Sequence, residues 1–94
     1  MEAKLQLREL IRQYEKRYTG RDGVQYHAQI WGRERYDGAW EGWIEFHPLV
    51  DTELVLSTAV ETMQITRSRL SRWAAGMEPL YLEGALRRAR LASS

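Results

Sequence analysis

The chain has 94 residues, a formal net charge of +1 and no cysteine. This length fits a single domain, which we place at 1–94 with a frayed end at 92–94. The lack of cysteine excludes disulfides, a cysteine nucleophile and thiolate metal sites. The sequence shows neither a membrane-spanning apolar stretch nor a secretory signal, so we expect a cytoplasmic, bacterial-type protein without a membrane partner.

The small net charge hides an uneven distribution of charged residues. Residues 24–65 carry two arginines against seven acidic residues, whereas 1–23 and 66–94 are both basic. A polyanion would be repelled by the middle of the chain and tolerated at its ends. The pattern also fits basic helices that lie on an acidic sheet, which is the simpler interpretation.

The first segment has the apolar spacing of a helix. Its apolar residues recur at intervals of three and four positions: Leu7, Leu10, Ile11, Tyr14 and Tyr18. Two glycines within 19–23 are expected to end this helix. We assign Tyr14 and Tyr18 to the core.

Two strands with alternating apolar and polar residues follow, over 24–32 and 39–47. The Asp37-Gly38 dipeptide between them is a strong hairpin signal. A three-residue loop at 36–38 places apolar residues opposite one another, with Ile30 facing Ile44. The same register places Trp31 opposite Trp43 on the other face of the sheet.

The remainder predicts a third strand over 53–61 and two helices. Thr66 or Ser68 caps a helix that runs to Ala75 with Gly76 after it, and Pro79 begins the last helix. The apolar side of the last helix comprises Leu80, Leu82, Ala85, Leu86, Ala89 and Leu91. The predicted fold is α+β in two layers: a three-stranded antiparallel meander with an N-terminal helix and two C-terminal helices, in the order α-β-β-β-α-α.

The face of the sheet that carries the tryptophans is the first candidate site. In the predicted register it displays two tryptophans among charged and histidine side chains: Trp31, Trp43, Arg33, Glu41, Glu45, His27 and His47. Opposed tryptophans with a charged rim are typical of surfaces that bind a protein partner or a second copy. Two structural explanations stay open, namely a Trp pair that only stabilises the sheet and a last helix that covers this face.

Nucleic-acid binding is the alternative function. The order helix-strand-strand-strand-helix resembles that of double-stranded-RNA-binding domains, which grip phosphates with the first helix and the start of the last one. The resemblance implies two groups of basic residues as the phosphate contacts: Lys4, Arg8, Arg12 and Lys16, and Arg67, Arg69 and Arg72. The Lys-Lys cluster of that family is replaced here by an Arg-Ser-Arg-Leu-Ser-Arg run.

A third hypothesis concerns His27 and His47, which the register places opposite each other near Glu45. Two imidazoles and a carboxylate could bind a transition metal or act as an acid–base pair. The sequence contains no HExxH, no glycine-rich phosphate loop and no GxSxG motif. We therefore predict a non-enzymatic protein with no cofactor, no resident metal and no catalytic residue.

Overall fold

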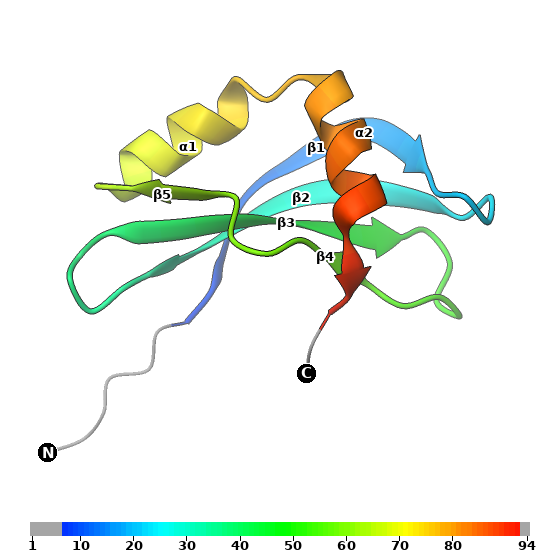
Figure 1. Cartoon of the computed structure of the whole chain (residues 1–94), viewed down its shortest axis with the longest axis horizontal. Helices are drawn as coiled ribbons and strands as arrows, with labels where there is room; N and C mark the ends of the chain where they lie inside the picture. The colour runs from blue at the N-terminus through cyan, green and yellow to red at the C-terminus, as the bar shows by residue number, and fades with distance from the viewer. Residues whose placement is uncertain (1–6, 93–94) are drawn as a thin grey trace, which may run out of the picture.

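A computed structural model describes residues 7–92, which form one antiparallel sheet and two helices (Figure 1). The strands are β1 (Glu9–Thr19), β2 (Gln25–Glu34), β3 (Trp40–Pro48), β4 (Leu56–Ser57), β5 (Thr62–Gln64) and β6 (Arg90–Leu91). The helices are α1 (Arg67–Ala75) and α2 (Pro79–Arg88). The strand order is β1-β2-β3-β4-β6, and β5 also pairs with β3. The predicted three-stranded meander is therefore wrong, because the sheet has six strands.

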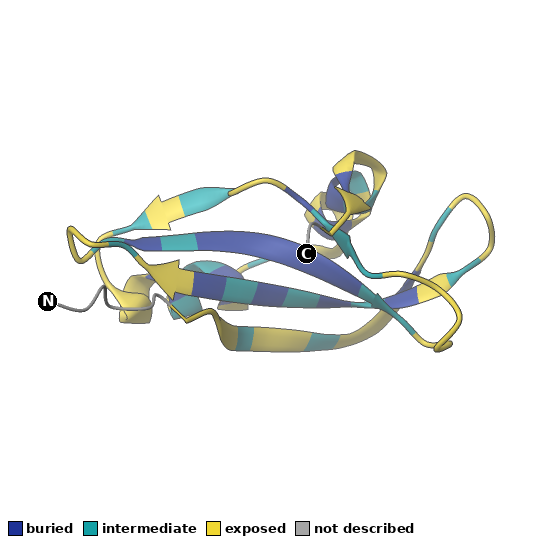
Figure 2. Cartoon of the chain, turned by 90° about the horizontal axis from the view of Figure 1, so that it is seen from below, coloured by how far each residue is buried: buried dark blue, intermediate teal, exposed yellow. Residues whose placement is uncertain are grey.

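The β2–β3 hairpin has the predicted register. Ile30 pairs with Ile44, and Trp31 pairs with Trp43. Gly38 adopts a φ of 87°, a left-handed conformation that glycine accepts without strain. Burial alternates along β2 but is nearly continuous along β3, as Figure 2 shows. The inner face of the sheet carries Ile30 and Ile44, and the outer face carries the two tryptophans.

The predicted N-terminal helix is wrong, because this segment forms β1, an edge strand paired with β2. The pairing of β1 shifts register between Leu10 and Arg12 and again between Gln13 and Arg17. Such bulges insert extra residues and change which positions share a face. As a result, Tyr14 and Tyr18 both point inward at a spacing that imitates a helix. Tyr18 is buried, and the Tyr14 hydroxyl donates a 2.5 Å hydrogen bond to the carbonyl of Ala74 in α1.

The predicted third strand over 53–61 is also wrong. Only β4 and β5 pair with β3 in this region, and residues 59–60 between them are exposed. Thr58 keeps the edge of β3 satisfied: its backbone N–H donates to the carbonyl of Ile44, and its Oγ1 accepts from the N–H of Ile44 at 3.1 Å. The segment therefore interrupts one edge of the sheet, while Thr58 still pairs both backbone polar groups of Ile44.

Both C-terminal helices form where the sequence predicts them, and both lie on the inner face (Figure 1). The Thr66 hydroxyl caps α1 by accepting a 3.1 Å hydrogen bond from the N–H of Arg69. The buried core combines residues of the inner face with residues of both helices: Tyr18, Tyr26, Ala28, Ile30, Ile44, Phe46, Ala74, Leu82, Ala85 and Ala89.

Two glycines in the sheet allow α1 to pack closely against it. Gly32 and Gly42 are paired across β2 and β3. A Cβ atom at either position would lie only 2.5 Å from a methyl group of Leu70, which is fully buried. The absence of side chains at both positions therefore creates the space that Leu70 fills.

Two residues that were predicted on the buried side of the last helix are exposed. Leu80 is 74% exposed, and Leu91 lies beyond the helix in β6, where it pairs with Leu56. The hydroxyl of Tyr81 donates to the carboxylate of Glu61, which also accepts from Arg88 at 2.6 Å. These bonds attach α2 to the segment between β4 and β5, and they turn Leu80 toward solvent.

Candidate functional site

The outer face of the sheet brings together the residues that the sequence proposed as a partner-binding surface. Trp31 and Trp43 are cross-strand partners, and so are Arg33 and Glu41, Gln29 and Glu45, and His27 and His47. Cross-strand partners project from the same side of a sheet. Because both helices pack on the inner face, α2 does not cover the tryptophans.

Glu45 is the centre of this face and is only 6% exposed. Its carboxylate accepts hydrogen bonds from Trp43 Nε1 at 2.9 Å, from His47 Nε2 at 2.8 Å and from Arg8 Nη1 at 2.5 Å. Burial alone would raise the pKa of Glu45, but the hydrogen bonds from Trp43, Arg8 and His47 outweigh burial and lower the pKa. Glu45 is therefore ionised near neutral pH and orients three neighbouring side chains.

Arginine side chains lie over the two tryptophan rings. The guanidinium carbon of Arg8 lies 3.9 Å from the centre of the Trp31 ring, and that of Arg33 lies 5.1 Å from the Trp43 ring. These are cation–π distances. Arg33 is also paired with Glu41 at 3.0 Å. Trp43 is consequently only 9% exposed, whereas Trp31 is partly exposed.

A second chain of hydrogen bonds connects Trp31 to the edge strand. Trp31 Nε1 donates to Gln29 Oε1 at 2.7 Å, and Gln29 Nε2 donates to Gln13 Oε1 at 2.6 Å. The Trp31 ring also stacks with the His47 ring at 6.4 Å between centroids. Both indole N–H groups therefore have partners within the chain, which fixes the orientation of the rings.

The histidine pair is present, but its members have different surroundings. His47 donates to Glu45, whereas the Nδ1 atom of His27 is buried without a hydrogen-bond partner. Within residues 7–92, no three His, Asp or Glu side chains are grouped so that they could hold a metal ion. Every carboxylate contact of Glu45 is with a donor, so the arrangement positions side chains and does not offer a free base.

The basic residues of the nucleic-acid alternative do not form one surface. Lys4 lies outside the described residues. Arg8 lies on the outer face, whereas Arg12 pairs with Ile30 and so lies on the inner side of β1, with its guanidinium over the Tyr14 ring. Lys16 lies over the Tyr18 ring.

The second basic group is divided as well. Arg67 in α1 is paired with Glu9 at 3.1 Å, while Arg69 and Arg72 are exposed. The resemblance to double-stranded-RNA-binding domains depended on a helix as the first element. Because that element is a strand, the resemblance in the order of elements is lost.

Sequence reasoning missed Arg8 and Gln13 as members of the outer face. Arg8 was assigned to a basic helix, and Gln13 to no site. The bulges of β1 conceal the alternation that would have placed Gln13 opposite Gln29. The one available signal was the pair of glutamines at similar distances from the turn at 19–24, which is too common to be specific.

The comparisons with known proteins give no further information: no family model matches the sequence, and no curated protein or solved structure matches it. Within the described part of the chain, neither helix has the length and apolar character needed to cross a bilayer. The functional argument therefore depends on the geometry of this chain alone.

Proposed function

We propose that this chain is a non-enzymatic binding module, and that the outer face of its sheet docks a second copy of the chain or another protein. The observation that carries the proposal is the stack of Arg8 on Trp31, held at 3.9 Å on a face that neither helix covers. Tryptophan and arginine are the residues most enriched among those that dominate binding energy at protein interfaces.

The hydrogen bonds of Glu45 support this role because they hold the surface in one conformation before a partner arrives. Arg8 and Trp43 both donate to the same carboxylate, so neither side chain has to be ordered on binding. Ordering a long side chain at an interface costs about 0.5–1.5 kcal/mol, and a rigid surface avoids that cost. Arg33 and Glu41 lie at the rim, where charged pairs favour specificity.

Trp31 is the expected anchor, since it is the less buried of the two rings. Trp43 supports the surface from below Arg33 and contributes through the rigidity of the network. We do not propose nucleic-acid binding, because Arg8 and Arg67 are engaged in ion pairs and Arg12 lies on the opposite side of β1 from Arg8.

Light scattering coupled to size-exclusion chromatography tests self-association on the wild type, on Trp31→Ala and on Arg72→Gln. Arg72 is exposed on α1 and is the control. We expect a dimer for the wild type and the control, and a monomer for Trp31→Ala with an unchanged circular dichroism spectrum. A dimer that survives Trp31→Ala but dissociates in high salt would contradict the proposal and assign association to the basic surfaces.

If the wild type is monomeric at every concentration, self-association is excluded. The alternative, that the outer face binds another protein, is then tested by cross-linking in the source cell. We expect the wild type and Arg72→Gln to capture the same protein, and Trp31→Ala not to capture it. Equal capture by all three would overturn the proposal.

A further inference from the structure

A groove lies at the opposite end of the molecule from the β2–β3 turn, and it shares none of the residues proposed for partner binding. It has a volume of about 840 Å³ and is open to solvent. Three segments form it: the turn at 19–24 with the end of β1, the stretch before β4, and the second half of α2 with β6. Small-molecule sites typically have volumes of about 300–1,000 Å³.

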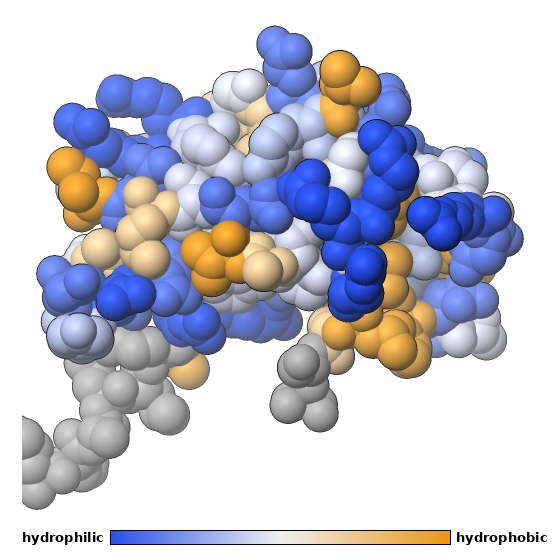
Figure 3. Space-filling view, in the orientation of Figure 1, coloured by the Kyte–Doolittle hydropathy of each residue, from blue (hydrophilic) through white to orange (hydrophobic). Residues whose placement is uncertain are grey.

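One side of the groove is apolar. Tyr18 and Tyr26 are buried at its base, and Leu56 and Leu86 form half-buried walls. At its mouth Leu54 is 65% exposed. Figure 3 shows hydrophobic side chains gathered around β4 and β6, directly below strongly hydrophilic ones around α2. The groove is therefore amphiphilic.

The charge of the groove is not balanced within the chain. Five cations line it against three acids: Lys16, Arg17, Arg21, Arg87 and Arg90 against Asp22, Glu53 and Glu83. Among the described residues, the first four of these cations make no ion pair, whereas Arg8, Arg33, Arg35, Arg67 and Arg88 all do. Arg90 donates to backbone carbonyls at the end of α2.

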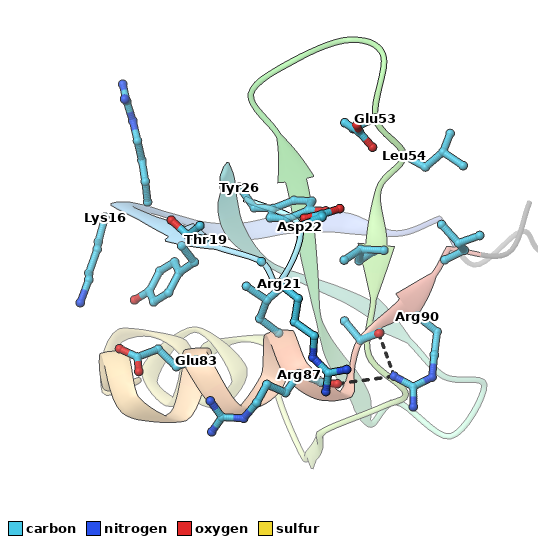
Figure 4. A pocket seen from close by; sticks show the side chains of 17 residues that line it. Lys16, Thr19, Arg21, Asp22, Tyr26, Glu53, Leu54, Glu83, Arg87 and Arg90 are labelled. Atoms are coloured by element: carbon cyan, nitrogen blue, oxygen red, sulfur yellow. Dashed lines mark hydrogen bonds between the residues drawn. The ribbon is translucent and has the colours of Figure 1, made fainter. Parts of the chain in front are cut away.

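The cations are spread along the groove: in Figure 4, Lys16 lies at one end and Arg90 at the other, with Arg21 and Arg87 between them. In Figure 4, Arg21 extends from the turn toward Arg87 on α2, while Glu53 lies on the other side of the groove. Two guanidinium groups from different elements, both without an acidic partner, form a suitable contact for an anionic group. The acids at the rim disfavour an extended polyanion.

We propose that this groove binds a small amphiphilic carboxylate, with its apolar body against Leu54, Leu56 and Leu86 and its head at Arg21 and Arg87. The proposal is independent of the outer face, so either can fail without the other. Fatty acids of medium chain length and aromatic acids have the required chemistry. A neutral molecule of the same shape should bind less well, because it leaves the two guanidinium groups without a partner.

Fluorescence titration with the dye 8-anilinonaphthalene-1-sulfonate tests the site, with uncharged N-phenyl-1-naphthylamine as its matched neutral probe. We expect saturable binding of one anionic dye per chain, displacement by decanoate, and at least about 10-fold weaker binding of the neutral dye. Failure of decanoate to displace the dye, or equal affinity for the two dyes, would overturn the proposal.

Variants locate the bound dye. Arg21→Gln with Arg87→Gln should weaken anionic dye binding about 10-fold or more and leave the neutral dye unaffected, while the control Arg72→Gln changes neither. Leu54→Ser should weaken the binding of both dyes, because it removes apolar contact area at the mouth of the groove. Leu80 is similarly exposed but belongs to a second groove between α1 and α2. Dye binding that is lost in Leu80→Ser and kept in Leu54→Ser would place the ligand there and overturn the proposal.

Discussion

On its inner face β3 presents Ile44 and Phe46 to the two helices, whereas on its outer face it presents Trp43 and Glu45 to side chains of the sheet itself. All four residues are buried. The inner face achieves burial through apolar packing, and the outer face achieves it through arginines over the tryptophan rings and a hydrogen-bonded carboxylate. The two faces are therefore buried to a similar extent but are stabilised by different interactions. Apolar packing on the inner face does not depend on pH, whereas the hydrogen-bonded network on the outer face does.

The largest expected effect is on the inner face. Phe46→Ala should lower the free energy of unfolding by about 3–5 kcal/mol, because it removes a large apolar side chain from a fully buried site and leaves a cavity. Urea denaturation at neutral pH measures the loss. Val50→Ala, at an exposed loop position, is the control and should change stability by less than about 0.5 kcal/mol. Equal stability of the two variants would show that the inner face is not the main core.

On the outer face, Glu45→Ala should lower the free energy of unfolding by about 1–3 kcal/mol. The substitution leaves Trp43 Nε1 and His47 without their acceptor. The loss should be smaller than for Phe46→Ala, because Arg8 can turn to solvent. Glu34→Ala at the exposed end of β2 is the control. A cost below that of the control would mean that the outer network does not contribute to folding.

The same network predicts the response to acid. The folded-state pKa of Glu45 is lowered from its ordinary value of 4.5, so its contribution is present above that pH and is lost as the pH falls through the folded-state pKa. The stability difference between the wild type and Glu45→Gln should therefore shrink below about pH 4.5. A difference that stays constant down to pH 2 would contradict the ionised network.

At alkaline pH the inner side of β1 should weaken instead. Burial raises the pKa of Tyr14 from 10.0 to about 12. Because the folded-state pKa is the higher one, the contribution of Tyr14 is complete below pH 10 and is lost as the pH rises toward 12. Thermal unfolding across this range should show a steeper loss for the wild type than for Tyr14→Phe. Tyr36→Phe, in the exposed turn, should behave like the wild type.

The smallest effect is expected at the rim of the outer face. Arg33→Gln removes a half-exposed ion pair with Glu41 and a cation–π contact with Trp43, each worth about 0.2–1 kcal/mol. Denaturation in low and high salt should show that the cost falls with ionic strength. A salt-independent loss as large as that of Glu45→Ala would indicate that Arg33 acts mainly by covering the Trp43 ring.

The sequence was sufficient to predict the β2–β3 hairpin because each strand has two chemically distinct faces. Moving the register by one residue would place Ile30 opposite Glu45, so the alternation itself selects one pairing. This register, confirmed in the structure, placed Trp31, Trp43 and Glu45 on one face. The Thr66 cap and the proline at the first position of α2 identified both helices for a similarly local reason.

The rest could not be predicted, because it depends on irregular pairing. The bulges of β1 give its inward residues a spacing of three and four, which is also the helical spacing. The short strands β4 and β6 contain two residues each, too few for any periodicity. The carboxylate network also includes Arg8, whose contact with Glu45 spans 37 positions and has no local signal.

The contact of Leu70 with Gly32 and Gly42 has a consequence for how the sequence can vary. A side chain at position 32 or 42 would occupy the volume that the leucine now fills. In a saturation-mutagenesis library, alanine at either glycine should be tolerated mainly together with a smaller residue at position 70. If substitutions at these distant positions compensate for each other, the library data alone would show that α1 packs on the β2–β3 hairpin.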